Sequence, residues 1–286
     1  MALFKRCWRL SIQIDDVVKT YQELANDETS LKIDFNVDSS FNGTFSNGEI
    51  TITGLTQRDI AFLSTNYELG SGKLKSSFVT LEVGYQDNIS LILNGNIFEA
   101  VPDFTSPDNS IRLKVMSGIE NNVNLANATL SLENATFKDL CQAVAKNNNV
   151  SLDFDSSVEN KVVGDYSFQG SPFQQIQELR NLNQDIYVTL SNNSLKVTSI
   201  NTSKAVKIKI DNKSGLIGSP IPSATGCEVT CLLNPSITIN DFISVESLKI
   251  PQLNSDYRIM AIKHIGGNRS DNWITILTLQ KAKYGI

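Results

Sequence analysis

The feature that most constrains this chain is the alternation of apolar and polar residues, with a period of two, in many short segments. Residues 8–14 (WRLSIQI) and 31–37 (LKIDFNV) show the alternation clearly, and it returns at 49–53, 79–85, 90–98 and 111–116. Successive side chains of a strand point to opposite faces, so this pattern is typical of half-buried β-strands. The first third of the chain is therefore predicted to form a β-barrel or a β-sandwich.

One segment of the first third has helical rather than strand spacing. Residues 57–64 carry apolar side chains at helical intervals, and Thr56 stands just before them as a possible N-cap. A short helix is predicted there, between the strands.

The pattern changes from about residue 121. Residues 137–144 place apolar side chains at i, i+3, i+4 and i+7, which predicts an amphipathic helix. A second helix is predicted after Ser171, because Pro172 suits the first helical position. Short strands are expected at 150–154, 186–190 and 194–198, so the middle of the chain is predicted to be a small α+β unit of two similar halves.

Strand alternation resumes in the last third, at 206–210 and 273–279. A chain of 286 residues also exceeds one typical domain of about 100–150 residues. The predicted organisation is a first β-rich domain over residues 1–120, an inserted α+β domain over 121–202 and a second β-rich domain over 203–286.

Charge excludes one class of function. The formal net charge is -5 and the basic residues do not cluster, whereas sequence-independent binding of nucleic acid needs a face rich in Lys and Arg. A passive channel for DNA is compatible with this balance. No apolar run is long enough for a secretory signal or a membrane-spanning segment, so we expect a soluble chain made inside the cell.

The cysteines predict neither disulfides nor a metal site. Cys7, Cys141, Cys227 and Cys231 are few and scattered, so free thiols are expected. Cys227 and Cys231 lack a second Cys pair, and His264 is the single histidine, whereas structural zinc takes four Cys or His ligands.

Catalytic motifs are also missing. His264 has no recognisable nucleophile or triad spacing near it. Four acidic residues could suggest a calcium loop or a glycosidase pair: Asp153, Asp155, Glu159 and Asp165. The segment that begins at Asp153 lacks the glycine at its sixth position and the glutamate at its twelfth position that a calcium loop requires. No catalytic, cofactor-binding or metal residue is therefore predicted, no cofactor is expected, and the chain is expected not to be an enzyme.

Three stretches resemble a known family. They are residues 47–55 (NGEITITGL), residues 214–220 (SGLIGSP) followed by 226–235 (GCEVTCLLNP), and residues 257–269 (YRIMAIKHIGGNR) before the Trp273 strand. Together they resemble the baseplate hub proteins of long-tailed phages. This resemblance implies a mainly β fold, in which two tube-type β-barrel domains flank the small α+β domain.

The resemblance also implies a function. Three copies are expected to form a homotrimeric ring that adapts the six-fold tail tube to the three-fold central spike and encloses the DNA path. Its partners are then the tail tube protein, the central spike protein and other baseplate proteins, and DNA passes without specific binding. The expected location is the tail baseplate of the virion, after synthesis in the host cytoplasm.

Two other functions stay open. A carbohydrate- or cell-surface-binding β module of a phage tail could use Tyr21, Tyr67 and Tyr187 as sugar platforms. A cell-wall hydrolase is disfavoured, because the sequence ends directly after the last predicted strand. The acidic balance is common among soluble proteins, and it would also suit a channel that repels DNA if carboxylates face the lumen.

Overall fold

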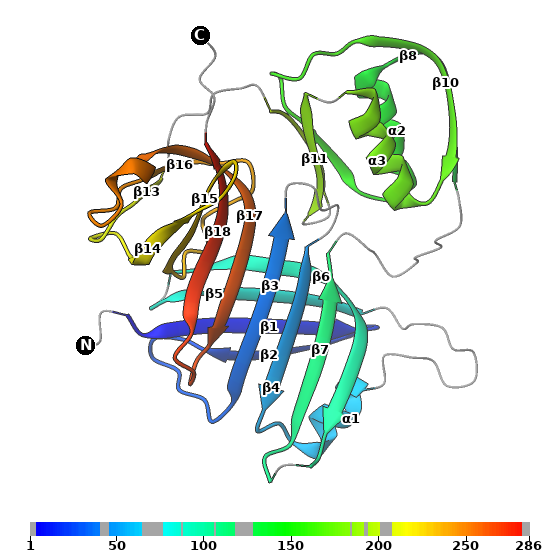
Figure 1. Cartoon of the computed structure of the whole chain (residues 1–286). Helices are drawn as coiled ribbons and strands as arrows, with labels where there is room; N and C mark the ends of the chain where they lie inside the picture. Colours follow the sequence, from blue (N-terminus) through cyan, green and yellow to red (C-terminus); the bar gives the residue numbers. More distant parts are fainter. Residues whose placement is uncertain are drawn as a thin grey trace.

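The computed structural model describes residues 4–40, 46–64, 77–86, 88–105, 107–117, 128–183, 185–191, 194–200 and 208–281. Within these residues the fold is mainly β (Figure 1). The strands are β1 (Arg6–Ile14), β2 (Val17–Glu23), β3 (Lys32–Ser40), β4 (Asn47–Thr53), β5 (Ser77–Tyr85), β6 (Asn88–Asp103), β7 (Ser110–Met116), β8 (Ala128–Thr136), β9 (Ser151–Phe154), β10 (Val162–Gly170), β11 (Ile186–Ser191), β12 (Ser194–Ser199), β13 (Ile208–Ile210), β14 (Leu216–Pro222), β15 (Gly226–Leu232), β16 (Phe242–Val245), β17 (Ser255–Gly267) and β18 (Trp273–Lys281). The helices are α1 (Gln57–Ser64), α2 (Phe137–Asn147), α3 (Pro172–Leu182) and the 3-10 turn η1 (Pro251–Leu253).

The strands predicted in the first third are confirmed, and each alternating segment lies in one of β1 and β3 to β7. The helix is confirmed as α1: the Thr56 hydroxyl accepts a hydrogen bond from the Asp59 backbone N–H at 3.1 Å and donates to the Asp59 carboxylate at 2.7 Å. Strand β2, which pairs with β1 in antiparallel register, was not predicted. Its Val17-Val18 start breaks the alternation that marks the other strands.

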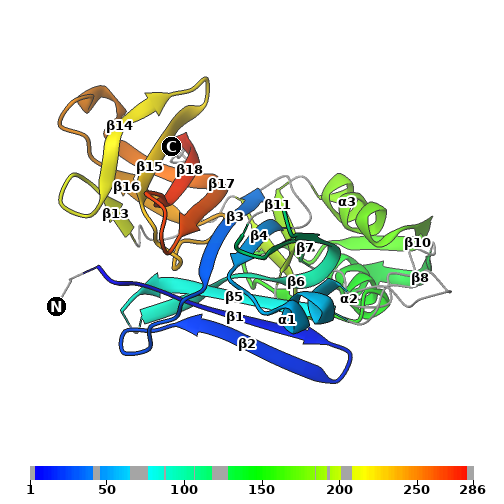
Figure 2. The same cartoon turned by 90° about the horizontal axis from the view of Figure 1, so that it is seen from below.

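One large sheet links the beginning and the end of the chain. Its strands follow the order β14-β15-β18-β17-β3-β4-β7-β6-β5-β1-β2, with β13 and β16 attached beside β17. The link is the antiparallel pairing of β17 with β3, from Ala261 opposite Ser40 to Gly267 opposite Asp34. Strands β1, β2 and β5 cross behind β3, β4 and β7 (Figures 1 and 2), so the first unit is a two-layered arrangement within this sheet.

The prediction of two closed barrels needs correction. The hydrogen-bonded order of the described strands is an open path from β14 to β2, and neither end returns to close a ring. The reason is that β3 and β17, which belong to different units, pair with each other and merge the two units into one sheet.

The middle of the chain forms a separate layered unit, in which β8 and β10 wrap around α2 and α3 (Figure 1). Strands β8 and β10 form a two-stranded sheet, and β11, β12 and β9 form a three-stranded sheet. Both predicted helices are confirmed, and each begins with a capping box, Thr136 with Asp139 and Ser171 with Gln174. The repeated cap supports the description of the unit as two similar halves.

The buried side chains gather in three clusters. One lies in the first unit, one in the middle unit between residues 130 and 197, and one in the last unit between 210 and 279. The first cluster also contains Leu233 and Trp273 from the far end of the chain. The Trp273 ring packs edge-on against Phe35, with ring centroids 5.3 Å apart.

Polar contacts fasten the β17–β18 hairpin to the first unit. Asn268 donates through Nδ2 to the Glu23 carboxylate at 2.6 Å and to the Leu31 carbonyl at 3.0 Å, and its Oδ1 accepts from the Ile33 N–H at 3.1 Å. The Arg6 guanidinium donates to the carbonyl of Gly267 at 2.7 Å. These contacts join β1 and β3 to the hairpin, so the first and last units form one body.

Candidate functional site

Part of the large sheet spans the first and last units: it runs from β14 through β15, β18, β17, β3, β4 and β7 to the second half of β6. This part, called the broad sheet below, has one buried face and one exposed face. In β3, for example, Ile33, Phe35 and Val37 are buried, whereas the alternate residues are partly or fully exposed. The pairing of β3 with β4 and β17, and of β4 with β7, places the exposed residues of each strand opposite those of the next, so their polar side chains share one face. Charged residues on it form ion pairs across or along strands: Lys114 with Glu99 at 2.7 Å, Lys32 with Asp34 at 2.9 Å and Lys263 with Asp38 at 3.7 Å.

The broad sheet has a free edge at each end, one at β14 and one at the second half of β6. Strand β14 pairs with β15 alone. The long strand β6 pairs with β5 through its first half, up to Gly95, and with β7 through its second half, from Asn96 to Asp103. Among the described residues no strand pairs with the other side of that second half. Unpaired strand edges are ready positions for pairing with another chain.

Exposed apolar side chains accompany both edges. On β14, Ile217 is 40% and Ile221 is 60% exposed, and on the second half of β6, Val101 is 37% exposed. Both edges also contain proline, at Pro102 and Pro220. Proline is confined to edge strands because it has no N–H to donate to a ladder, so this residue is a sequence signal that could have identified the edges.

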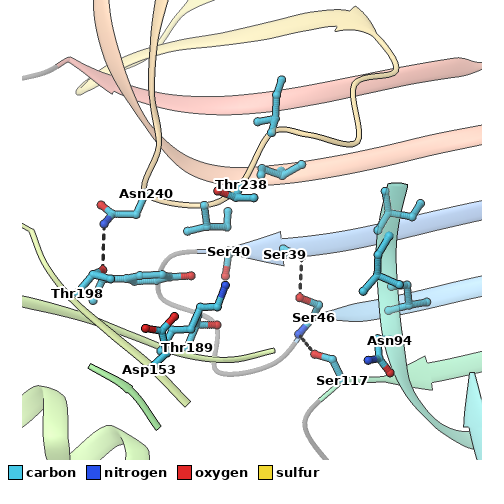
Figure 3. A pocket seen from close by; sticks show the side chains of 18 of the residues that line it. Ser39, Ser40, Ser46, Asn94, Ser117, Asp153, Thr189, Thr198, Thr238 and Asn240 are labelled. Carbon is cyan, nitrogen blue, oxygen red and sulfur yellow. Dashed lines mark hydrogen bonds between the residues drawn. The ribbon is translucent and has the colours of Figure 1, made fainter. Parts of the chain in front are cut away.

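A polar cavity of about 540 Å³ lies where the three units meet. Its lining comes from β3 and β6 in the first unit, from β9, β11 and β12 in the middle unit, and from the loop before β16 in the last unit (Figure 3). Hydroxyl and amide side chains dominate it; those labelled are Ser39, Ser40, Ser46, Asn94, Ser117, Thr189, Thr198, Thr238 and Asn240, beside the carboxylate of Asp153.

Two hydrogen-bond groups stabilise the cavity walls. On the side of the first unit, the Ser39 hydroxyl donates to Ser46 at 2.7 Å, and the Ser46 N–H donates to Ser117 at 2.7 Å. On the opposite side of the cavity, Asn240 donates through Nδ2 to the Thr198 hydroxyl at 3.1 Å. This bond connects the middle unit to the last unit, and the Arg258 guanidinium strengthens the connection by donating to the Ile200 carbonyl.

His264 lies in the cavity wall and is only 5% exposed. Its Nδ1 is 2.9 Å from the Thr275 hydroxyl oxygen, which already accepts a hydrogen bond from the Asn234 N–H at 3.0 Å. The Thr275 hydroxyl proton is thus available to Nδ1, as a neutral imidazole requires. Burial lowers the pKa of His264 to about 4. Because Thr275 is fully buried and His264 almost so, this contact is part of the packed interior of the sheet.

The acidic residues considered from the sequence do not form one site. Asp153 and Asp155 line the cavity. Asp165 instead accepts a hydrogen bond from the Asn134 N–H at 2.9 Å, and Glu159 is an exposed partner of Lys161 at 3.5 Å. Within the described residues no group of three or more His, Cys, Asp or Glu side chains could hold a metal ion.

All four cysteines are buried free thiols, as predicted. Burial raises the pKa of Cys141 and of Cys231 to about 12, so these two thiols stay protonated and unreactive at neutral pH.

Of the three tyrosines considered as sugar platforms, the two that the structure describes are not fully exposed. Tyr187 is 4% exposed, and burial raises its pKa to about 12. Tyr21 is half-buried and its hydroxyl oxygen is inaccessible. Tyr67 lies outside the described residues. Of the helices that the structure describes, none is long and apolar enough to cross a membrane.

A family model and several solved structures match the chain. The model of a family described as baseplate hub gp41 matches residues 9–279. Among solved structures, the chain resembles a 43 kDa tail protein of prophage MuSo2 from Shewanella oneidensis, with a TM-score of 0.66, 12% identity and coverage of 96% of this chain and 98% of that one. A tail protein from Neisseria meningitidis MC58 gives a TM-score of 0.68, with 10% identity and 96% coverage of both chains.

A third similar structure is the E. coli c3393 protein, described as a type VI secretion component with structural similarity to the T4 tail proteins gp27 and gp5. Its TM-score is 0.62 at 10% identity, over 95% of this chain and 77% of that one. At such identities these likenesses show the fold alone. No curated protein sequence matches the chain.

Proposed function

The chain belongs to the baseplate hub gp41 family, and on that premise we propose that three copies form a ring that connects the tail tube to the central spike and encloses the DNA path. Membership makes it a structural component of a phage tail, with the virion tail as its location. Beyond family membership, we propose the homotrimer, its binding partners, the DNA channel and synthesis in the host cytoplasm.

The free edges of the broad sheet carry this proposal. Eight strands run side by side from β14 to the second half of β6, and both ends are unpaired among the described residues. Because the two edges differ, pairing β14 of one copy with β6 of the next is a head-to-tail contact, which closes into a ring when the rotation between copies allows it. Three copies would then continue one sheet around a channel, and the two flanking units would become tube-type barrels only in the assembled ring.

The three hydrophobic clusters support a division into domains at 1–120, 121–202 and 203–286. In a trimer the first and last domains would supply six β-rich units in all. Such a ring could meet a six-fold tube on one side and a three-fold spike on the other, so the tube protein, the spike protein and other baseplate proteins are the proposed partners.

The exposed face of the sheet is the proposed channel wall. Three of its lysines are paired with carboxylates, so it offers DNA few free cations. This balance suits the passage of DNA without specific binding. We propose no catalysis and no cofactor. Since Tyr187 is buried and Tyr21 is half-buried, neither of the described tyrosines supports the carbohydrate-binding alternative.

Mass in solution tests the ring. We expect light scattering to give three times the 31.5 kDa chain mass at high protein concentration or with tube and spike proteins present. The variant Ile221→Lys places a charge on the β14 edge and should give a monomer. Leu248→Lys, at a position 84% exposed and outside this edge, is the matched control and should still associate. A wild-type chain that stays monomeric with all partners added would refute the proposal.

A further inference from the structure

Strand β2 ends the large sheet on the side away from the proposed channel wall. It pairs with β1 alone, in a regular antiparallel register that begins at Ile14 opposite Val17, and no described strand pairs with its other side. Strands β1 and β5 cover the buried face of the broad sheet, since Trp8 and Leu81 share its core. Strand β2 therefore lies on the outside of the ring that we propose, and in Figure 2 the β1–β2 hairpin runs along the outer edge of the molecule.

The free side of β2 presents backbone groups in a fixed alternation. A two-residue turn, Asp15-Asp16, joins β1 to β2, and the residue pair that flanks such a turn exchanges both backbone hydrogen bonds. Along an antiparallel pair, residues that bond to the partner strand alternate with residues whose N–H and C=O groups point the other way. The outward groups therefore belong to Val18, Thr20 and Gln22, and none of them bonds to a described residue.

This edge has none of the features that commonly keep another strand away. Sheet edges are often protected by proline, by a β-bulge, by an unpaired lysine or by a covering loop. Strand β2 contains no proline and pairs with β1 without a register shift. Its first two side chains are open to solvent, with Val17 51% and Val18 60% exposed. A further strand could therefore pair here without any rearrangement of the chain.

The lysine of β2 points to the covered side. Lys19 lies opposite the buried Ile12, and its Nζ is 2.5 Å from the Asp59 carboxylate of α1 and 4.5 Å from the centre of the Phe62 ring. An unpaired lysine beside the edge would hinder strand addition, because pairing would desolvate its charge. Helix α1 neutralises this charge and also holds β2 in place, so less conformational entropy is lost when a partner binds.

Side chains beside the free edge define the partner. On the outer face of β2, Val18 and Thr20 are both exposed, and a β-branched side chain of a neighbouring strand packs well against them. Asp16, in the turn, is exposed and forms no ion pair within the described part of the chain. A Lys or Arg at the adjacent end of the incoming strand would therefore be attracted to the edge.

We propose that β2 accepts an extended segment of a separate protein as an additional strand, one segment per copy of the chain. The segment exchanges backbone hydrogen bonds with Val18, Thr20 and Gln22 and carries a basic residue beside Asp16. A second copy of β2 does not supply that residue, because its Lys19 is already paired with Asp59. The inference rests on the proposed function only in placing this edge on the outside of the ring.

The test uses the full chain and a fluorescent peptide of about nine residues, within the usual length of a strand, that alternates valine and threonine and has a lysine at each end. Fluorescence anisotropy measures its affinity. Val18→Pro removes one outward N–H and leaves the bonds to β1 intact, so the fold should be retained, which circular dichroism checks. We expect this variant to bind the peptide about tenfold more weakly.

Two further variants separate backbone pairing from other contacts. Val18→Thr keeps the N–H and the β-branched shape, and it should retain most of the binding. Asp16→Asn should weaken binding by about threefold at low salt and by less at high salt. Equal affinity of wild type and folded Val18→Pro, or absence of binding by wild type, would overturn the inference.

Amide hydrogen exchange gives a second readout that is specific to strand addition. The peptide should slow exchange at Val18, Thr20 and Gln22 and leave it unchanged at Val17 and Lys19, whose N–H groups already bond to β1. Exchange that is not slowed at the three outward amides would also contradict the inference.

Light scattering on the same samples distinguishes failure of this site from failure of the ring. Val18→Pro should have the same mass as wild type, because β2 lies outside the edges that form the ring. A wild-type mass above that of a trimer, lowered to the trimer by Val18→Pro, would assign the edge to a second copy and overturn the inference of a separate protein.

Discussion

The buried histidine makes a quantitative prediction about stability and pH. The pKa of His264 in the folded chain is about 4, against an ordinary value of 6.5, because burial disfavours the charged imidazole. The unfolded chain therefore binds the proton more tightly. Stability from this group is complete above pH 6.5 and is lost as the pH falls toward 4. Between pH 7.5 and pH 4.5 the loss is about 2.5 kcal/mol, from the difference in protonation of the two states.

Urea unfolding at these two pH values measures the loss. The control variant is His264→Asn, which keeps a polar atom near the Thr275 hydroxyl and does not titrate in this range. It should be less stable than wild type at pH 7.5, and its stability should fall by about 2.5 kcal/mol less than that of wild type on acidification. Carboxylates titrate in both proteins, so their contribution cancels in the comparison.

Nuclear magnetic resonance gives an independent check, because His264 is the only histidine in the chain. Its ring resonances should stay those of a neutral imidazole down to about pH 5. A titration midpoint near 6.5 in the folded protein, or an equal pH dependence of wild type and His264→Asn, would refute the account of a buried neutral imidazole.

Three further predictions follow from the packing and the caps. Gly266→Ala should lower the free energy of unfolding by about 2 kcal/mol in urea titrations, because the added Cβ would lie 2.4 Å from the Phe35 ring and 2.8 Å from the Trp273 ring. An unchanged urea midpoint would contradict this close packing. Thr136→Ala removes the cap of α2 and should cost about 1 kcal/mol, measured by thermal unfolding, whereas Thr136→Ser should restore most of it. The four buried thiols should react with a thiol reagent only after denaturant is added, and reaction of any of them in the native protein would show that the cores open readily.

Local patterns predicted the elements of this fold well. The alternation in residues 31–37 gave β3 because one face of that strand is buried and the other is polar. The apolar spacing of residues 137–144 predicted α2, and Pro172 after Ser171 predicted the start of α3. In the structure Thr136 and Ser171 cap these helices, because their side chains satisfy backbone N–H groups that any helix leaves unpaired.

Long-range pairing could not be predicted in the same way. Nothing in the local pattern of β17 specifies β3 as its neighbour, because any half-buried strand edge could satisfy the same backbone groups. The polar cavity was missed for a related reason: Ser40, Thr189 and Asn240 are ordinary loop or strand residues until the three units place them together. Pro102 and Pro220 are the local signals for the free edges, because proline has no N–H to donate to a neighbouring strand.

The contribution of Trp273 and Leu233 to the first core has a consequence for synthesis on the ribosome. The unit formed by β1 to β7 emerges first, but two side chains of its core and one of the two partners of β3, strand β17, are encoded much later in the message. Strand β4 can pair with one edge of β3 early, but a nascent chain must leave the other edge of β3 unpaired until β17 has been translated, and long-range strand pairing of this kind is slow. Prematurely terminated chains would retain an open strand and an incomplete core. Only chains that already include β17 and Trp273 could then enter particle assembly, and shorter fragments would be left to aggregation or proteolysis.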